Sequence, residues 1–327
     1  MPLEFVRNDI TKMKVDVVVN SANPRAIVGG GVDRAIHKAA GPELLIARQR
    51  IGNIATGKAF ITPGYNLLAQ YVIHTVGPVW QDGKHGEREL LADCYKNSLQ
   101  LAADYSCKAI AFPLISAGIF GCPPEIAIAV ATRAIREFID EYDLDVYMVM
   151  FDRESFKISS SLFDDVQNYI DEVYVDEHLA QESCNNYQRR REREAALYRN
   201  RGTDSRSLDE ILNDMTDTFS EALLKLIDAK GMTDPQVYKR ANINRKHFSK
   251  IRNNQAYKPK KSTVFALSIA LELNIAETRE LLARAGYAFS HSNVSDVIIE
   301  YFIKQGKYDI DTINQVLFEK GEPTLGV

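Results

Sequence analysis

The sequence has few of the features that mark secreted, membrane-bound or metal-binding proteins. Its 327 residues include only four cysteines, with no Cys-x-x-Cys pair and no histidine cluster beside them. This scarcity argues against a zinc site or a disulfide framework and favours a reducing compartment. The start, MPLEFVRND, lacks a charged-then-apolar leader, and the longest apolar run, residues 109–120, is too short to span a bilayer. We therefore expect a cytoplasmic protein that makes no membrane contact.

An excess of positive charge is also missing. The formal net charge is −4, which excludes a uniformly basic nucleic-acid binder but permits a local basic patch. What the sequence does have is 45% hydrophobic residues, with 15 Tyr and 14 Phe, as expected of a folded chain. Its length suits two ordinary domains.

The first half alternates short β-branched runs with helical stretches. The runs cover residues 15–20, 71–76, 109–114 and 146–151, and the clearest helices cover residues 32–40, 87–105 and 124–142. Alternation of this kind predicts an α/β fold with a mostly parallel sheet and helices on both faces.

The character of the chain changes after residue 155. An acidic stretch is followed by the basic run at residues 189–193, and from residue 207 onward every apolar cluster has helical spacing. We predict a first domain over residues 1–180, a charged linker or helix over 181–206 and an all-α domain over 207–327.

Two glycine-rich loops carry the strongest chemical signal. The first, residues 20–33, reads NSANPRAIVGGGVD, and the second, residues 113–121, reads PLISAGIFG. Each follows an apolar strand, and glycines at a helix start let backbone N–H groups approach an anion. Two such loops at the carboxyl ends of parallel strands would close on one diphosphate. Neither loop ends as a Walker P-loop does and neither reads GxGxxG, so ordinary NAD dehydrogenase chemistry is unsupported.

Asp33 falls in the first turn of the predicted phosphate-binding helix. One interpretation is that it complements the helix dipole, an effect worth about 0.3–1 kcal/mol. A carboxylate there also repels the anion, however, which suggests a function such as holding or deprotonating a water.

These segments resemble the macrodomain family. NDIT at residues 8–11, VDVVVNSAN at 15–23, GGGVDRAIHKAAG at 29–41, YVIHTVGP at 71–78 and FPLISAGIFG at 112–121 are similar to its motifs. Asn23 followed by Gly30-Gly31-Val32-Asp33, together with Gly118-Ile119-Phe120-Gly121, resembles the MacroD-type hydrolase branch. The resemblance implies a three-layer α/β/α macrodomain with a mixed, mostly parallel sheet, and binding of ADP-ribose without a cofactor or metal.

The resemblance also implies roles for individual residues. Asp9 and the backbone of Ile10 would hold the adenine, Phe151 would pack on it, and Asn23 and Asp33 would form the catalytic pair, with Asp33 positioning a water. The diphosphate and distal ribose would be surrounded by Ala22, Val28, Gly29, Gly30, Gly31, Val32, Ser116, Ala117, Gly118, Ile119, Phe120 and Gly121.

Two departures from the pattern concern substrate preference. Asn8 replaces the usual Gly, and Ala117 replaces the usual Thr. His37 and His74 follow the pattern, and we expect both to be buried structural residues.

The second half resembles the Xre/Cro-repressor helix-turn-helix over residues 219–286. In that arrangement four side chains of the basic helix would face a DNA major groove: Arg245, Lys246, Ser249 and Lys250. Helix-turn-helix bundles also serve in dimerisation and protein docking, and both alternatives stay open.

Three functions remain possible from the sequence. The first is hydrolysis of ADP-ribose conjugates on acidic side chains, nucleic-acid ends or an acetyl ester. The second is recognition of ADP-ribose or a related signal without turnover. The third is a ligand-responsive DNA-binding regulator. Fusion of a hydrolase to a helix-turn-helix would suit stress or phage defence. The Asn23–Asp33 pair favours the enzyme.

Overall fold

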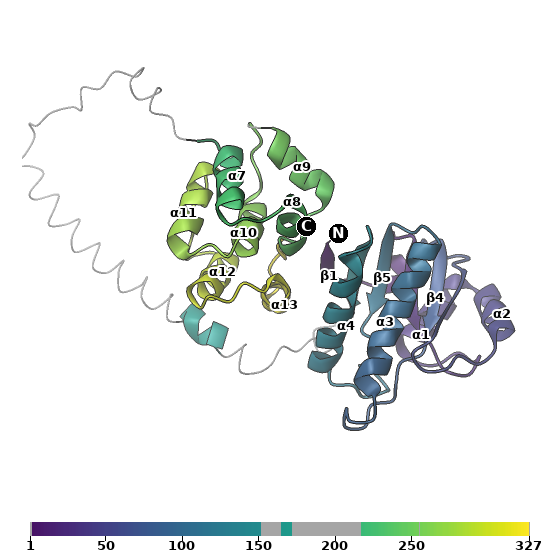
Figure 1. Ribbon diagram of the computed structural model, residues 1–327. Coiled ribbons are helices and arrows are strands. Elements are labelled where there is room, and N and C mark those ends of the chain that lie inside the picture. The colour runs from purple at the N-terminus through teal and green to yellow at the C-terminus, as the bar shows by residue number, and fades with distance from the viewer. Residues whose placement is uncertain (1, 152–164, 172–216, 255, 327) are drawn as a thin grey trace, which may run out of the picture.

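The computed structural model describes residues 2–151, 165–171, 217–254 and 256–326. They form an α/β unit followed by an all-helical unit (Figure 1). The basic run at 189–193 and both predicted boundaries of the linker lie outside the described residues, so the domain limits stay predictions. No helix of the described residues combines the length and apolarity needed to cross a membrane.

The α/β unit is built on one six-stranded sheet of order β1-β6-β5-β2-β4-β3. All neighbouring pairs are parallel except β3 with β4, which is antiparallel. The strands are β1 (Leu3–Arg7), β2 (Val17–Ser21), β3 (Ala59–Pro63), β4 (Tyr71–Thr75), β5 (Ala109–Pro113) and β6 (Asp145–Met150). The predicted α/β fold with a mixed, mostly parallel sheet is confirmed.

Helices cover both faces of this sheet. They are η1 (Ile10–Lys12), α1 (Gly31–Ala40), α2 (Pro42–Ile51), α3 (Glu87–Asp104) and α4 (Pro124–Ile139). Alternate residues of β2 point to opposite faces: Val17 and Val19 pack with α3 and α4, whereas Val18 packs with α1 and α2. The three-layer arrangement follows from this alternation.

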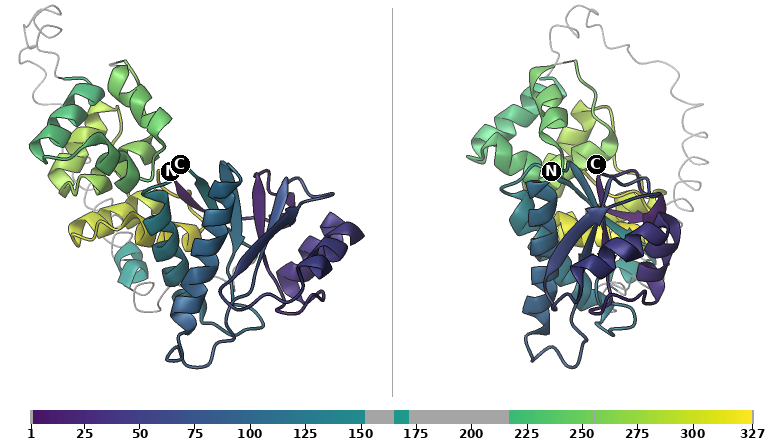
Figure 2. Two further views of the ribbon diagram at one scale, coloured as in Figure 1. Left: turned by 45° about the vertical axis from the view of Figure 1, so that its right-hand side comes forward. Right: turned by 90° about the vertical axis from the view of Figure 1, so that its right-hand side faces the viewer.

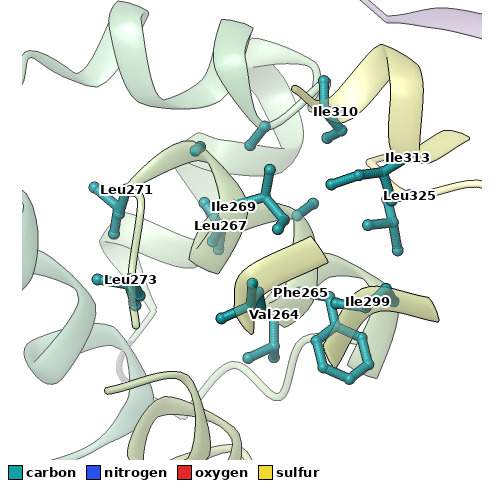
Figure 3. Close-up of a cluster of buried hydrophobic side chains, with 14 of the residues drawn as sticks. Val264, Phe265, Leu267, Ile269, Leu271, Leu273, Ile299, Ile310, Ile313 and Leu325 are labelled. Carbon is teal, nitrogen blue, oxygen red and sulfur yellow. The ribbon is translucent and has the colours of Figure 1, made fainter. Parts of the chain in front are cut away.

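The second unit consists of short helices around one apolar core, shown in Figure 3. They are α7 (Phe219–Ala229), α8 (Asp234–Arg240), α9 (Arg245–Asn253), α10 (Lys261–Ala270), α11 (Ile275–Arg284), α12 (Val294–Lys304) and α13 (Ile310–Lys320). Helix α10 is the central one, because nearly all of its residues are buried. The helical segment at 165–171 also contributes Val166 and Ile170 to this core.

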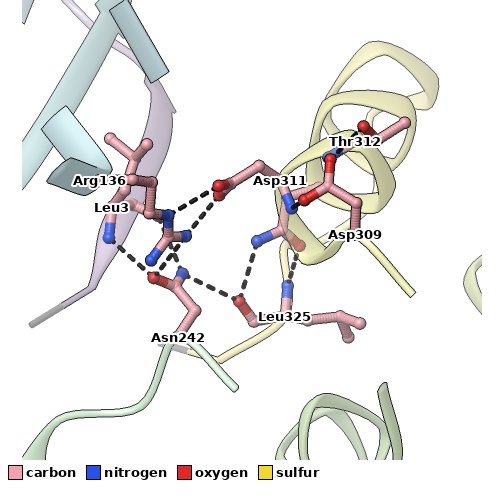
Figure 4. A network of polar contacts seen from close by, with 8 residues as sticks. Leu3, Arg136, Asn242, Asp309, Asp311, Thr312 and Leu325 are labelled. Atoms are coloured by element: carbon pink, nitrogen blue, oxygen red, sulfur yellow. Dashed lines mark hydrogen bonds and ion pairs between the residues drawn. The ribbon is translucent and has the colours of Figure 1, made fainter. Parts of the chain in front are cut away.

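The two units contact each other along β1, the edge strand of the sheet. Figure 4 shows the Asn242 side chain accepting a hydrogen bond from the N–H of Leu3 (2.8 Å) and donating one to its carbonyl (2.9 Å), as a neighbouring strand would. Arg136 of α4 forms a two-bond ion pair with Asp311 of α13. Phe318 of α13 packs against Phe5 in the core of the sheet. The helical unit therefore covers an otherwise open sheet edge.

Candidate functional site

Four segments that are distant in sequence converge at one edge of the sheet. Strands β1, β6, β5 and β2 are consecutive neighbours and run parallel, so their carboxyl ends share that edge. Asp9 follows β1, Phe151 follows β6, and the two glycine-rich loops follow β5 and β2. This edge is where ligands bind in open parallel sheets.

Asp33 lies in the first turn of α1, which begins at Gly31 after a loop that ends with Gly30. The residue is only 3% exposed. One carboxylate oxygen accepts a hydrogen bond from the N–H of Gly29, and the other accepts one from Nδ2 of Asn20 at 2.6 Å. Each carboxylate oxygen has two acceptor positions, so these bonds leave room for a water.

The Asn23 side chain lies close to the same face of Gly29 as this carboxylate. A Cβ atom at Gly29 would lie 3.1 Å from Oδ2 of Asp33 and 3.9 Å from Nδ2 of Asn23. The structure therefore brings the two predicted catalytic side chains to the same glycine. Asn23 Oδ1 accepts from the N–H of Arg25 (2.9 Å), which leaves its amide nitrogen on the Gly29 side.

A buried polar cluster supports Asp33 from behind. Asn20 donates to Asp33 and also lies 3.2 Å from Nδ1 of His74, while Nε2 of His74 lies 3.0 Å from the Thr62 hydroxyl. That hydroxyl lies 3.4 Å from the Val72 carbonyl, to which it donates. We therefore assign the Nε2-protonated tautomer to His74, with Nδ1 accepting from Asn20.

Burial keeps both histidines of this cluster neutral. It lowers the pKa of His74 to about 3, helped by the positive charge of Arg48. Burial also lowers the pKa of His37, against the opposing effect of Asp33. His37 Nε2 lies 3.6 Å from Asp33 Oδ1. The expectation that both are buried is confirmed, although His37 also touches the predicted catalytic carboxylate.

Arg48 of α2 is a member of the cluster that the sequence did not reveal. Its guanidinium donates to the carbonyls of Gly52 and, at 3.0 Å, Asn23, and the residue is 2% exposed. It thus ties α2 to the loop that carries Asn23. In sequence it is one of two arginines in α2, and only its burial distinguishes it from Arg50.

The second loop is closed by its own backbone. The N–H of Cys122 donates to the Ser116 carbonyl, and the N–H of Gly121 donates to Gly118, each at 2.9 Å. Ser116 is 4% exposed, and its hydroxyl donates to the Pro78 carbonyl. Only the backbone of Ser116 is therefore available to a ligand.

The two loops meet through one side chain. A Cβ at Gly30 would lie 2.9 Å from Cδ1 of Ile119, so a side chain at Gly30 would displace that of Ile119. Ile119 is otherwise 83% exposed. The remaining predicted loop residues have the following exposure: Val28, Gly31, Gly118 and Gly121 are exposed, Ala117, Phe120, Val32, Gly29 and Gly30 are half-buried, and Ala22 is buried.

The predicted adenine end lies at β1 and β6. Asp9 caps the η1 helix, with Oδ1 accepting from the N–H (3.0 Å) and hydroxyl (2.7 Å) of Thr11. The Ile10 side chain is buried, so its backbone alone can contact a ligand, whereas the Phe151 ring is 76% exposed and open to stacking.

One group in the described residues has the spacing of metal ligands. Asp82, His85 and Glu87 bring ligand atoms within 4.8 Å of one another. The Glu87 carboxylate, however, accepts hydrogen bonds from the backbone N–H groups of Gln81, Gly83 and His85. Its role is to close the turn before α3.

The helical unit presents a separate basic surface. Helix α9 is capped by Asn244, whose side chain accepts from the N–H of His247. The four predicted groove-facing residues, Arg245, Lys246, Ser249 and Lys250, are all exposed. Lys258 and Lys260 are exposed beside them, and Lys250 and Lys260 add to burial in lowering the pKa of His247.

Comparison with known proteins finds relatives of the α/β unit. The Macro domain family profile matches residues 19–131. A macro domain-containing protein of Chlorobaculum tepidum is 52% identical over 159 residues, covering 44% of this chain and 92% of that protein. A protein of Escherichia fergusonii named O-acetyl-ADP-ribose deacetylase is 47% identical over 166 residues, covering 49% of this chain and 94% of the relative.

Among solved structures, the Oceanobacillus iheyensis macrodomain with ADP is 43% identical. It covers 47% of this chain and 85% of its own, with a TM-score of 0.46. This chain belongs to the macro domain family. Each of these matches spans less than half of it, and the family profile ends well before the helical unit.

Proposed function

We propose that the α/β unit binds ADP-ribose and hydrolyses ADP-ribose conjugates, as a member of the MacroD-type branch. The proposal rests on one observation above all: the Asp33 carboxylate is held at a helix N-terminus beside Asn23. A site that only bound an anion would gain nothing from a carboxylate there. Relatives from Escherichia fergusonii and Salmonella typhimurium, 47% and 48% identical, are named O-acetyl-ADP-ribose deacetylase.

The ligand would lie along the carboxyl edge of the sheet. Asp9, the Ile10 backbone and Phe151 would hold the adenine, the two loops would bind the diphosphate, and Asn23 would orient the distal ribose. Asp33 would position a water against the ribose linkage, and as a general base it would contribute about 10²–10⁴-fold. A cytoplasmic location is part of the proposal.

The test is release of ADP-ribose from a protein mono-ADP-ribosylated on Glu or Asp, and from the acetyl ester. Asp33→Ala is compared with the wild type, with calorimetric titration of free ADP-ribose alongside. Turnover lost with binding retained supports the hydrolase. Ala35→Gln, a change to an exposed residue on α1, controls for general damage to the helix.

A non-catalytic reader is the second candidate, because Asp33 is buried and each of its oxygens already accepts a protein hydrogen bond. A carboxylate used only to hold the loop would look the same. Binding of ADP-ribose without turnover of any substrate would establish the reader and eliminate the enzyme.

For the helical unit we propose nucleic-acid binding through a helix-turn-helix formed by α8 and α9. Five exposed cations gather there, and none of them forms an ion pair with the residues that the structure describes: Arg245, Lys246, Lys250, Lys258 and Lys260. Fluorescence anisotropy with duplex DNA tests this, and affinity should fall steeply with salt. Lys246→Glu should weaken binding, whereas salt-insensitive self-association would favour a docking role instead.

A further inference from the structure

A hollow of about 400 Å³ opens beside α1 and α2. Figures 1 and 2 show α2 at the end of the α/β unit away from the helical unit. Its apolar wall comes from Val28, Pro42 and Leu45, and its polar wall from Arg34, His37 and Lys38. Arg34 and Lys38 are one helical turn apart, so their side chains rise from the same face of α1.

This hollow adjoins the predicted catalytic carboxylate. Val28 directly precedes Gly29, whose N–H donates to Asp33, and His37 Nε2 lies 3.6 Å from Asp33 Oδ1. If the distal ribose lies against Asn23 and Asp33, the group attached to that ribose has this hollow beside it. The inference therefore rests on the proposed function.

His37 adds an independent observation. Its side chain is 6% exposed, and its Nδ1 atom has no hydrogen-bond partner among the residues that the structure describes. Buried polar atoms are almost always paired, so this unpaired atom marks an unsatisfied polar position in the wall of the hollow.

The charge around the hollow is positive although the chain is acidic overall. Arg34 and Lys38 are exposed, and neither forms an ion pair within the described segments. Glu43 is the exposed acid closest in sequence to the hollow wall, and its Oε2 would lie 3.0 Å from a Cβ at Gly41. The cations outnumber it, so the hollow favours an anionic group.

The groups that could be attached to the distal ribose differ in the charge that they would bring to the hollow. An acetyl group or a glutamyl side chain joined to ribose forms a neutral ester. A terminal phosphate joined to ribose forms a diester that keeps one negative charge, and further phosphates of a strand follow it. We propose that this hollow is an acceptor subsite for the terminal phosphate of a nucleic-acid strand, with Arg34 and Lys38 contacting its phosphates.

The reaction at such a substrate balances with water alone. The oxygen of a water held by Asp33 bonds to the anomeric carbon, and the bond between that carbon and the phosphate oxygen breaks. The electron pair leaves with the phosphate, which becomes a terminal phosphomonoester. The proton released by the water passes through Asp33 to solvent or to the phosphate. The products are ADP-ribose and the phosphorylated strand.

The test compares two substrates of the full chain: a single-stranded DNA oligonucleotide ADP-ribosylated on its 5′-phosphate, and O-acetyl-ADP-ribose. The double variant Arg34→Glu/Lys38→Glu should lower kcat/KM for the oligonucleotide about tenfold more than for the acetyl ester. The dependence of log kcat/KM on log salt should flatten by about one unit or more in that variant. Lys14→Glu, an exposed charge reversal before β2 at the opposite edge of the sheet, should change neither ratio nor slope.

The possible results separate this proposal from the function on which it rests. Equal losses on both substrates, or turnover of the acetyl ester but not of the oligonucleotide, overturn the subsite and leave the hydrolase intact. Sensitivity confined to a Glu-modified acidic peptide would assign the hollow to a protein acceptor and refute the proposal. If no substrate turns over, binding provides the test. The subsite then requires that the modified oligonucleotide bind more tightly than free ADP-ribose and that the double variant lose this difference in affinity. Any other binding result overturns the subsite.

Discussion

The two units bury polar groups in different ways. In the α/β unit a group of them forms a cluster behind the glycine-rich loop, and two of its atoms, Asn20 Oδ1 and His37 Nδ1, have no partner in the described structure. In the helical unit the buried acids are paired: Asp296 with Lys261, and Glu300 with Arg279, His291 and Lys304.

This difference separates structural polar groups from functional ones. A buried ion that is fully paired holds neighbouring elements in register, whereas an unpaired buried atom costs free energy unless a ligand or water satisfies it. The hydroxyls of Thr132 and Thr278 also lack partners in the described residues, but each is a single group on a helix. Only the cluster around Asp33 combines unpaired atoms with an adjoining loop.

Among the substitutions that test this difference, Arg48→Met should change the free energy of unfolding most. Because the change removes a buried cation and leaves the Gly52 and Asn23 carbonyls without their donor, we expect it to lower the free energy of unfolding by about 3 kcal/mol. Urea denaturation measures this, with Arg50→Met, an exposed neighbour on the same helix, as control. A similar small loss in both variants would mean that the cluster does not hold the loop.

The contact between the units should be the next most costly to break. Asp311 is nearly buried and forms two bonds with Arg136, so Asp311→Ala should destabilise the chain by about 2 kcal/mol. A double-mutant cycle with Arg136→Ala should give a coupling of about 1–3 kcal/mol. Coupling below about 0.5 kcal/mol would place this pair with ordinary surface ion pairs.

The buried histidines predict an acid sensitivity specific to the α/β unit. The pKa of His74 is lowered to about 3 in the folded chain. Below about pH 6.5 this side chain therefore binds a proton in the unfolded chain but stays neutral in the folded one. Stability is therefore complete above pH 6.5 and falls, through this residue, by about 1.4 kcal/mol per pH unit toward pH 3.

His74→Gln should flatten the stability profile between pH 5.5 and 4.5, a range inside that window. Denaturation at several pH values measures the difference between variant and wild type. His85→Gln, which changes an exposed histidine, should leave the slope as it is. An unchanged slope in His74→Gln would show that this histidine accepts a proton in the folded state.

The smallest effect concerns local structure in the helical unit. Asn274 caps α11 by accepting from the N–H groups of Ala276 and Glu277, and Glu277 bonds back to its N–H. Asn274→Ala should cost about 1 kcal/mol, measured by thermal unfolding, while Asn274→Ser should retain most of the stability. Equal losses in both variants would contradict a capping role.

Several elements of the fold could be predicted from their residues. The run at 71–76 predicted β4, which spans Tyr71–Thr75, and the stretch at 87–105 predicted α3, which spans Glu87–Asp104. β1 and β3 were not predicted. Both are edge strands in which only some of the residues are buried, and β3 contains Pro63, so neither has the continuous apolar run of the central strands. Helix α2 follows α1 after Gly41 alone and lacks an apolar stripe of its own.

The candidate site was predicted only in part. The glycine-rich loops and the Asn23–Asp33 pair stand out because their residue types are unusual at those positions. The fixing of the Ser116 hydroxyl by the Pro78 carbonyl, and of Asn23 by Arg48, depends on segments that meet only after folding. Their catalytic and binding roles stay predictions until the variants are measured.

The sequence by itself determined the alternation of strands and helices, the change to helical spacing in the second half and the positions of the anion-binding loops. These depend on periodicity and on glycine, which act locally along the chain. The tertiary structure decided that Asn20, Arg48 and His74 lie behind Asp33, and that Asn242 bonds to Leu3 across 239 positions. Such contacts depend on the packing of distant elements, which no local pattern records.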